Sequence, residues 1–413
     1  MGKVTVELKA NGVNLGVFEE INPTWNGNDA SYLATLKTVP KFAAINNPNG
    51  YRYKSTLTKG TLTINTNVNL TSASDKFNDI LMEREKVLIN AGKTITGNGR
   101  GLSMGSNKNA TANTESGYTN RGIVNISGGT VSKGVAGINV SYGNILNDTK
   151  GIVNVNIGAG LYATNDSKVE NKGTINITGS GTGIAVKGIA DKQVKNKAGK
   201  LVTVPVFNYG NIGKIEISNS GKINVAGSNA IGIYAHNNRN ATQSLVKITN
   251  NSSLSLGNSG VGILLKGEGG LINLGGNSTI KVGTNGIGVY GEKAIVTLTT
   301  DQTIETKENG VGIYTAGTSK IVGGKTLTYK YTGINTKTGI ATLFAGTNSQ
   351  NNINIQLSNS TNTTGGMVGV FVSGRGTFNN TGNLITNTEG TVALYVKDGA
   401  TFNHTPGKNN IKW

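Results

Sequence analysis

The chain has 413 residues, of which 36% are hydrophobic and 15% charged, with 61 glycines, no cysteine and a formal net charge of +18. The lack of cysteine excludes a disulfide scaffold, and no run of about eighteen apolar residues is present to form a membrane helix. So much Gly, Asn, Ser and Thr is also typical of disorder, but regularly spaced Ile and Val pairs argue against it.

Residues 1–56 lack the repeat described below and contain three of the five prolines, at positions 23, 40 and 48. We interpret this segment as an irregular N-terminal cap or pairing segment, because the exposed end of a repeat fold has unpaired backbone groups that can pair with another chain. Residues 75–86 are the best candidate for a helix, capped by Ser74 or Asp75. Residues 1–6 are too polar for a signal peptide, and we interpret the chain as a fragment of a longer protein.

A short motif recurs along the rest of the chain, read as Gly-Ile-Gly-Val-Tyr at 286–290 and Gly-Val-Gly-Ile-Tyr at 310–314. A second element, Asn-x-Gly-x-Ile-x-Ile, precedes each copy by about ten residues, as at 171–177, and a third apolar run fills the rest of the period. Successive copies lie about 23 to 30 residues apart, which is the period of a solenoid. The copies are aligned on the residue two positions before the aromatic one. In successive copies this residue is Gly137, Gly160, Gly183, Gly232, Gly262, Gly288, Gly312, Thr342, Gly369 and Ala393.

These features predict an all-β fold: a single-stranded, right-handed parallel β-helix over residues 57–413, with about 23–30 residues per rung. Strands of successive rungs pair about 4.8 Å apart, and right-handedness is the rule for parallel crossovers. Ile287 and Val289 are expected to point inward and to stack on Val311 and Ile313. Gly and Asn are expected at the corners, because Asn tolerates left-handed backbone angles and stacked Asn side chains form hydrogen bonds between rungs.

One step of the repeat is 49 residues long and contains a lysine-rich insertion at about 187–206. Loops that leave a rigid solenoid are where such scaffolds carry function. The insertion is therefore one candidate binding site, with a solvated hairpin as the alternative, since lysine-rich runs are usually just solvated. Its candidate residues are Lys187, Lys192, Lys195, Lys197 and Lys200.

The aromatic position of the repeat is the second candidate site. If Ile287 and Val289 point inward, Tyr290 points outward or lies at a corner. An outward column of aromatic residues stacks on sugar rings or on a partner, or else covers the corner and packs along the sheet, which is the commoner role. The column contains Tyr162, Tyr234, Tyr290, Tyr314, Phe344, Phe371 and Tyr395.

Catalytic signatures are not evident. Polysaccharide-cleaving β-helices need clustered carboxylates or a basic residue that takes a proton, but the 21 acidic residues are scattered. His236 and His404 lie in Asn-rich stretches that read as turns, and no metal or phosphate motif is present. We therefore predict a protein that is not an enzyme and has no cofactor or metal, with a carbohydrate-active β-helix enzyme as the disfavoured alternative.

The charge predicts long-range attraction to anionic surfaces. Nucleic acid is not expected as a partner, because aromatic residues are not interleaved with arginines and no nucleic-acid fold signature is present. The partner is expected to be a surface protein or glycan of a bacterial or host cell, and the chain is expected to be a monomer.

The repeat motifs, best seen at 171–177 and 285–293, resemble the passenger domains of large fusobacterial autotransporters of type V secretion. The resemblance covers residues 56–413. The resemblance implies a right-handed β-helical passenger on the bacterial cell surface, anchored in the outer membrane by a translocator barrel and used for coaggregation or host-cell attachment. The chain contains neither signal peptide nor barrel, so it corresponds to an adhesive segment or to a passive stalk. A trimeric autotransporter head is a further alternative, but its repeat is nearer fourteen residues.

Overall fold

The computed structural model describes strands and turns and, within the described residues, no helix. These residues are 4–10, 13–20, 24–26, 29–31, 33–36, 52–54, 61–71, 79–82, 86–98, 101–104, 117–128, 136–141, 143–164, 167–187, 192–195, 201–204, 215–236, 246–334, 337–346, 348–358, 366–386 and 390–405. The chain folds as two compact units, residues 1–186 and 187–413.

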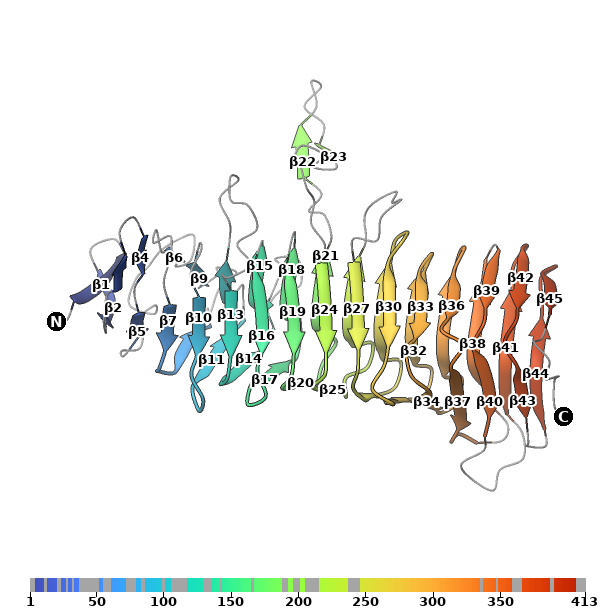
Figure 1. The fold of residues 1–413 in the computed structure, drawn as a ribbon. Helices are drawn as coiled ribbons and strands as arrows, with labels where there is room; N and C mark the ends of the chain where they lie inside the picture. The colour runs from blue at the N-terminus through green and yellow to red at the C-terminus, as the bar shows by residue number, and fades with distance from the viewer. Residues whose placement is uncertain are drawn as a thin grey trace. The chain divides into compact units, whose positions relative to one another are not determined.

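In each unit the strands follow one another through three sheets, which we call A, B and C in the order in which the chain visits them (Figure 1). In the first unit, sheet A contains β1 (Val4–Ala10), β2 (Val13–Glu20), β5 (Leu33–Leu36), β7 (Thr61–Ile64), β10 (Lys86–Ile89), β13 (Gly117–Asn120), β16 (Asn144–Asn147) and β19 (Lys168–Asn171). Sheet B contains β8 (Val68–Leu70), β11 (Thr94–Gly97), β14 (Ile123–Ile126), β17 (Ile152–Val155) and β20 (Thr174–Ile177). Sheet C contains β6 (Arg52–Lys54), β9 (Asp79–Met82), β12 (Gly101–Met104), β15 (Ala136–Ser141), β18 (Ala159–Thr164) and β21 (Thr182–Lys187).

The second unit repeats this order. Its sheet A contains β24 (Ile215–Asn219), β27 (Val246–Asn250), β30 (Leu271–Leu274), β33 (Ile295–Leu298), β36 (Lys320–Val322), β39 (Ser349–Asn351), β42 (Thr377–Asn380) and β45 (Thr401–His404). Sheet B contains β25 (Lys222–Val225), β28 (Leu254–Leu256), β31 (Thr279–Val282), β34 (Gln302–Thr306), β37 (Thr326–Tyr331), β40 (Asn354–Leu357) and β43 (Leu384–Thr386). Sheet C contains β26 (Ile231–His236), β29 (Val261–Lys266), β32 (Ile287–Glu292), β35 (Val311–Ala316), β38 (Gly339–Ala345), β41 (Met367–Ser373) and β44 (Thr391–Val396).

The core consists of inward side chains that stack from rung to rung. In β14 the inward residues Val124 and Ile126 pair in register with Val153 and Val155 of β17, and all four are at most 3% exposed. Each strand contributes only two or three such residues, so a low apolar content is enough to fill the interior, and their burial drives folding. The predicted parallel β-helix is confirmed.

The N-terminal strands pair differently from the rest. β1 pairs antiparallel with β2, β2 pairs antiparallel with β5, and β3 (Thr24–Asn26) and β4 (Asp29–Ser31) form a separate antiparallel pair. Parallel pairing begins at Leu33, which lies opposite Thr61.

The helix predicted for residues 75–86 is wrong. The described part of this segment forms β9, whose Ile80 pairs in parallel with Tyr53 of β6 and Leu102 of β12, and Lys86 already belongs to β10. Pairing with strands on both sides overrides the weak local helix preference of a short segment.

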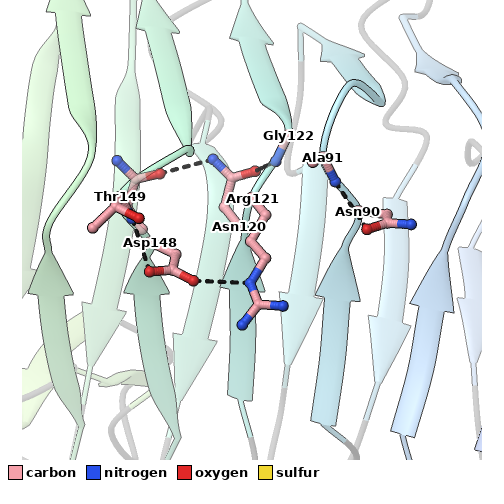
Figure 2. Close-up of polar contacts among 8 residues, drawn as sticks. Asn90, Ala91, Asn120, Arg121, Gly122, Asp148 and Thr149 are labelled. Carbon is pink, nitrogen blue, oxygen red and sulfur yellow. Dashed lines mark hydrogen bonds and ion pairs between the residues drawn. The ribbon is translucent and has the colours of Figure 1, made fainter.

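The corner between sheets A and B is built on buried asparagines. In the first unit Asn120 Nδ2 donates to Asn147 Oδ1 at 2.8 Å, and Asn147 Nδ2 donates to Asn171 Oδ1 at 2.7 Å. Asn120 Oδ1 also accepts from the Gly122 amide at 3.1 Å, so the side chain satisfies the backbone of its own turn (Figure 2). Asn219–Asn250 and Asn351–Asn380 form equivalent contacts in the second unit. The predicted Asn hydrogen bonds between rungs are confirmed, and they explain the Asn-x-Gly element of the repeat.

The turn that enters sheet C uses left-handed backbone angles. Asn229, Asn285 and Asn309 have φ of 58°, 57° and 54°, and Ser259 has φ of 54°. Asn adopts this conformation more readily than most residues, as predicted for the corners.

Candidate binding surface

The outward face of sheet C in the second unit is the strongest candidate site. In β32, Ile287, Tyr290 and Glu292 face outward and are partly exposed, whereas Gly288, Val289 and Gly291 are buried. In β26, β29 and β35 the same positions face outward and inward, and the last residue of β29, Lys266, is exposed. Two consecutive inward residues interrupt the usual alternation, so outward positions fall at the first and fourth residues of the strand.

A glycine makes this interruption possible. A Cβ added to Gly288 would lie 2.6 Å from the carbonyl oxygen of Gly312 in the next rung, and Gly232, Gly262 and Gly312 meet the next rung at 2.5 to 2.6 Å. The paired residues confirm the irregularity, because Ile287 pairs with Val311 and Val289 with Ile313 while the glycines between them do not pair. The glycines of the motif therefore serve the backbone, as expected for triplets that belong to the repeat.

The outward residues form two columns along the unit. The aliphatic column contains the first outward residue of each strand: Ile231, Val261, Ile287, Val311, Ile340, Val368 and Val392. The aromatic column contains the fourth-position residue: Tyr234, Leu264, Tyr290, Tyr314, Leu343, Phe371 and Tyr395. We call the two columns together the apolar stripe. Most of its side chains are half-buried, Val368 is buried at 8% exposed, and Val392 and Tyr395 are 43% and 46% exposed.

The structure corrects the facing predicted for Ile287 and Val311. Val289 and Ile313 are 0% exposed and stack inside the unit as predicted, but Ile287 and Val311 face outward. The prediction assumed strict alternation and missed the consecutive inward pair at Gly288 and Val289. It therefore also missed the whole aliphatic column. The signal in the sequence was the glycine between the two aliphatic residues of each motif.

Phe344 does not belong to the aromatic column. In β38 Leu343 pairs with Tyr314 and with Phe371, whereas Phe344 is 2% exposed and packs its ring 4.3 Å from that of Phe378. The aligned glycine position of this rung is Ala341 and not Thr342. Aligning the copies on the aromatic residue shifted this rung by one position, and a one-residue shift moves a strand residue to the opposite face.

The aromatic rings of the stripe contact one another. Tyr290 and Tyr314 meet edge to face with ring centroids 5.0 Å apart, and Phe371 and Tyr395 stack with centroids 5.0 Å apart and planes 28° apart. Burial raises the pKa of Tyr234, and burial together with Glu292 and Tyr314 raises the pKa of Tyr290. The hydroxyls therefore stay neutral at physiological pH.

Polar residues border the stripe on both sides. On one side lie the turn residues Asn229, Ser259, Asn285 and Asn309, with Asn309 Nδ2 donating to Asn285 Oδ1 at 3.0 Å. On the other side lie the last outward positions of the sheet C strands, four of them polar and two of them alanine: His236, Lys266, Glu292, Ser373, Ala316 and Ala345. The two columns themselves contain no Asp, Glu, Lys or Arg.

The outward faces of sheets A and B in the same unit are more polar. On sheet B, Lys281 and Lys330 lie 3.6 Å and 3.9 Å from the carboxylate of Glu305. On sheet A, outward Lys247 and Lys320 are exposed, with Leu271 and Ile295 between them along the sheet. Among the described residues of this unit, continuous apolar columns on the outward face are thus confined to sheet C.

Tyr162 lies in the first unit, apart from the stripe. It faces outward on β18 and pairs with Asn139 of β15. The first positions of β15 and β18 hold Ala136 and Ala159, whose side chains are single methyl groups. In these two strands the first unit therefore has no column of Ile and Val beside the aromatic position.

The lysine-rich insertion contains a β-hairpin. β22 (Lys192–Lys195) pairs antiparallel with β23 (Leu201–Val204), so that Lys192 lies opposite Val204 and Lys195 opposite Leu201. Lys187 is the last residue of β21. Lys197 and Lys200 lie outside the described residues, and a binding role for the five lysines stays a prediction.

Several titratable groups of the described residues form contacts that stabilise the fold. At a corner of the first unit, Arg121 Nε lies 2.8 Å from Asp148 Oδ2 and lowers the pKa of that carboxyl, as Figure 2 shows for the pair. Lys172 and Lys168 lower the pKa of Glu170, and a hydrogen bond from Thr284 lowers that of Glu308. Nowhere in the described part of the chain do three or more His, Cys, Asp or Glu residues gather as metal ligands would.

The two histidines lie at strand ends and not in turns. His236 ends β26 and His404 ends β45, where His404 Nδ1 lies 2.8 Å from Asn380 Nδ2. The part-buried His404 thus follows the buried Asn351 and Asn380 in a polar ladder, which gives it a structural contact that its sequence neighbours did not indicate. The described residues include no helix that could cross a membrane.

Comparison of the chain with models of protein families, with curated proteins and with solved structures finds no match.

Proposed function

We propose that this chain is a segment of a bacterial cell-surface adhesin, a non-enzymatic β-helical passenger that attaches to other bacteria or to host cells. The apolar stripe carries this proposal. A solenoid needs its inward ladders for stability, whereas two outward apolar columns along one sheet are typical of an interaction site. Aromatic and aliphatic residues with few charges and a polar border match the composition of interface cores.

The sequence pattern supports the cellular setting of this proposal. The frame at 171–177 and 285–293 resembles fusobacterial autotransporter passengers. By that resemblance, the parent chain is anchored in the outer membrane and presents this segment outside the cell. The partner is a protein or glycan of another cell surface, and the segment acts as a monomer that does not bind nucleic acid.

Binding of the purified 413-residue chain to intact bacteria and epithelial cells tests the proposal. We expect saturable binding that competes with whole bacteria carrying the parent protein. A titration of salt separates this binding from attraction by the net charge of +18, which weakens as salt screens it. Binding that vanishes with moderate salt, or no binding at all, would contradict an adhesive role.

A passive stalk is the second candidate function. The contact between the rings of Phe371 and Tyr395, and that between Tyr290 and Tyr314, favours it, because aromatic residues on sheets often stabilise the sheet by packing along it. A stalk predicts that Tyr314→Ser lowers the stability of the chain and leaves cell binding unchanged. An adhesive stripe predicts the loss of binding in a variant that remains folded.

A further inference from the structure

We propose that the apolar stripe binds an acidic amphipathic helix of a partner protein. This inference deepens the proposed function, because it rests on the stripe being an interaction surface, and it names the occupant. Three properties lead to it: the dimensions of the stripe, the orientation of its aromatic rings and the net charge of the whole chain.

The dimensions of the stripe match those of one helix. Seven sheet C strands carry the stripe, and strands about 4.8 Å apart give it a length of about 29 Å. The two columns are three residues apart along each strand, which gives a width of about 10 Å. An α-helix is about 10–12 Å wide and would cover this length with about 20 residues. Its pitch of about 5.4 Å is close to the strand spacing, so apolar residues at i, i+3, i+4 and i+7 can follow successive rungs.

A second copy of the chain fits the stripe less well. The footprint of about 29 by 10 Å is roughly 300 Å², whereas a stable interface buries about 800 Å² on each partner. Two copies would also each carry a net charge of +18 and repel one another. The small footprint favours a slender occupant held weakly, with affinity gained from many displayed copies.

A glycan is disfavoured by the orientation of the rings. Sugars stack on the flat faces of aromatic rings, but Phe371 and Tyr395 turn these faces toward each other at 5.0 Å. Tyr290 and Tyr314 likewise contact each other, with planes 74° apart. The second column is aliphatic throughout and offers no ring at all. Such a surface suits leucine-like side chains, which pack against ring edges and methyl groups alike.

The charge of the chain selects an acidic helix. The stripe itself is uncharged, and its border carries charges of both signs, with the exposed Lys266 and Lys397 beside Glu292 and Asp398, so the preference for an acidic helix comes from the net charge of the whole chain. The net charge of +18 attracts an acidic partner from a distance and repels a basic one. The apolar side of the helix then contacts the stripe, while its acidic side faces the solvent and the basic residues at the border.

A labelled 20-residue peptide provides the test. It carries Leu at i, i+3, i+4 and i+7 positions and Glu elsewhere, and lactam bridges hold it as a helix. Its binding to the full 413-residue chain is measured by fluorescence anisotropy at low and physiological salt. A peptide of the same composition in scrambled order, and one with Lys in place of Glu, serve as controls. The stripe variant carries Val311→Thr and Tyr314→Ser at the middle rung, and the control variant carries Leu271→Thr and Ile295→Thr on the outward face of sheet A.

We expect micromolar binding of the helical acidic peptide, at least tenfold weaker binding by the stripe variant, and no change in the control variant. The scrambled and basic peptides should bind at least tenfold more weakly. Circular dichroism and thermal melting confirm that both variants remain folded. If the stripe variant does not fold, the single substitution Val311→Thr replaces it.

Several results would overturn the inference. Equal binding of the scrambled peptide, or equal binding by a folded stripe variant, would show that charge alone attracts the peptide. Self-association that the stripe variant loses in sedimentation would identify a second copy as the occupant. Binding to dextran that the stripe variant loses, without peptide binding, would identify a glycan.

Cell attachment separates this inference from the proposed function. A stripe variant that attaches to cells as well as the unchanged chain would overturn the inference and leave the adhesive role standing. Stripe-dependent peptide binding by a chain that attaches to no cell would support the inference and contradict the adhesive role.

Discussion

At the scale of single residues, one glycine per rung decides which side chains face the solvent. Gly288 lets two consecutive residues turn inward, and Tyr290 and Ile287 face outward as a result. The space that a Cβ would need at Gly288 is occupied by the carbonyl oxygen of Gly312 at 2.6 Å. Ala341 takes the same place in its rung, so the position accepts a methyl group there.

We predict that Gly288→Val destabilises the chain by about 2–3 kcal/mol, because a branched side chain overpacks the space between two rungs. The matched control is Ile287→Val, the adjacent outward position, where a change of about 0.5 kcal/mol or less is expected. Urea unfolding followed by circular dichroism measures both. Equal effects would show that the close approach at Gly288 does not restrain the strand.

The buried asparagine ladder makes a second prediction at this scale. Asn147→Leu removes an acceptor from Asn120 and a donor from Asn171, and leaves buried polar groups without these bonds. We expect a loss of about 2–3 kcal/mol of unfolding free energy. Asn154 forms the same two kinds of bonds, with Asn125 and Asn176, on the part-buried outer face of sheet B.

Asn154→Leu is therefore the matched control for Asn147→Leu. Water can replace its lost partners, so we expect a loss below about 1 kcal/mol. Thermal melting and urea titration of the two variants give the comparison. Similar losses would mean that burial adds little to the ladder at the corner.

At the scale of elements, the turn that enters sheet C places the stripe. Asn285 and Asn309 adopt left-handed angles there and hydrogen-bond to each other. The residue that follows each of these asparagines is the inward glycine that opens the motif, and the first outward aliphatic residue comes next. The turn thus sets the register of each strand of the stripe.

We predict that Asn309→Val costs about 1–2 kcal/mol, since a β-branched residue is strained in the left-handed region. Asn309→Gly should be close to neutral, because glycine adopts the same angles freely while the exposed hydrogen bond to Asn285 contributes little. Thermal melting of the valine and glycine variants measures their order of stability. A glycine variant as unstable as the valine variant would assign the effect to the side-chain hydrogen bond instead.

Alignment of the copies on their aromatic residue places the outward residue wrongly in one rung, the one that contains Phe344. Phe344 was placed in the aromatic column because it resembles Tyr314, yet Leu343 occupies that place and Phe344 packs inside against Phe378. The same strand position accepts Leu, Tyr or Phe on its outward side. Side-chain type is therefore a weaker marker of register than the backbone requirement for glycine.

At the scale of the whole molecule, the carboxylates make stability depend on pH. Asp148, Glu170 and Glu308 have pKa values held below their ordinary range by hydrogen bonds and nearby cations. Their deprotonated forms stabilise the folded chain, and this contribution is fully present above the pKa values of the unfolded state. It is lost as the pH falls through the lower pKa values of the folded state.

We therefore predict that the melting temperature is steady near neutral pH and falls below about pH 4.5, where the unfolded carboxylates begin to bind protons. The triple variant Asp148→Asn, Glu170→Gln and Glu308→Gln should start from a lower melting temperature and show a shallower fall. Glu216→Gln, at an exposed position of β24, is the control. An unchanged acid slope in the triple variant would contradict the assignment.

The sequence by itself determined the parallel β-helix, its period, the asparagines at the corners and the presence of an outward aromatic column. These features are local or periodic, and each rung repeats the same backbone requirements. Only the tertiary structure decided that the aliphatic column also faces outward, that Leu343 replaces Phe344, and that residues 79–82 form a strand. The physical reason is that facing and pairing depend on contacts with the neighbouring rung: a carbonyl next to Gly288, and strands on both sides of β9, outweigh the preferences of the segment alone.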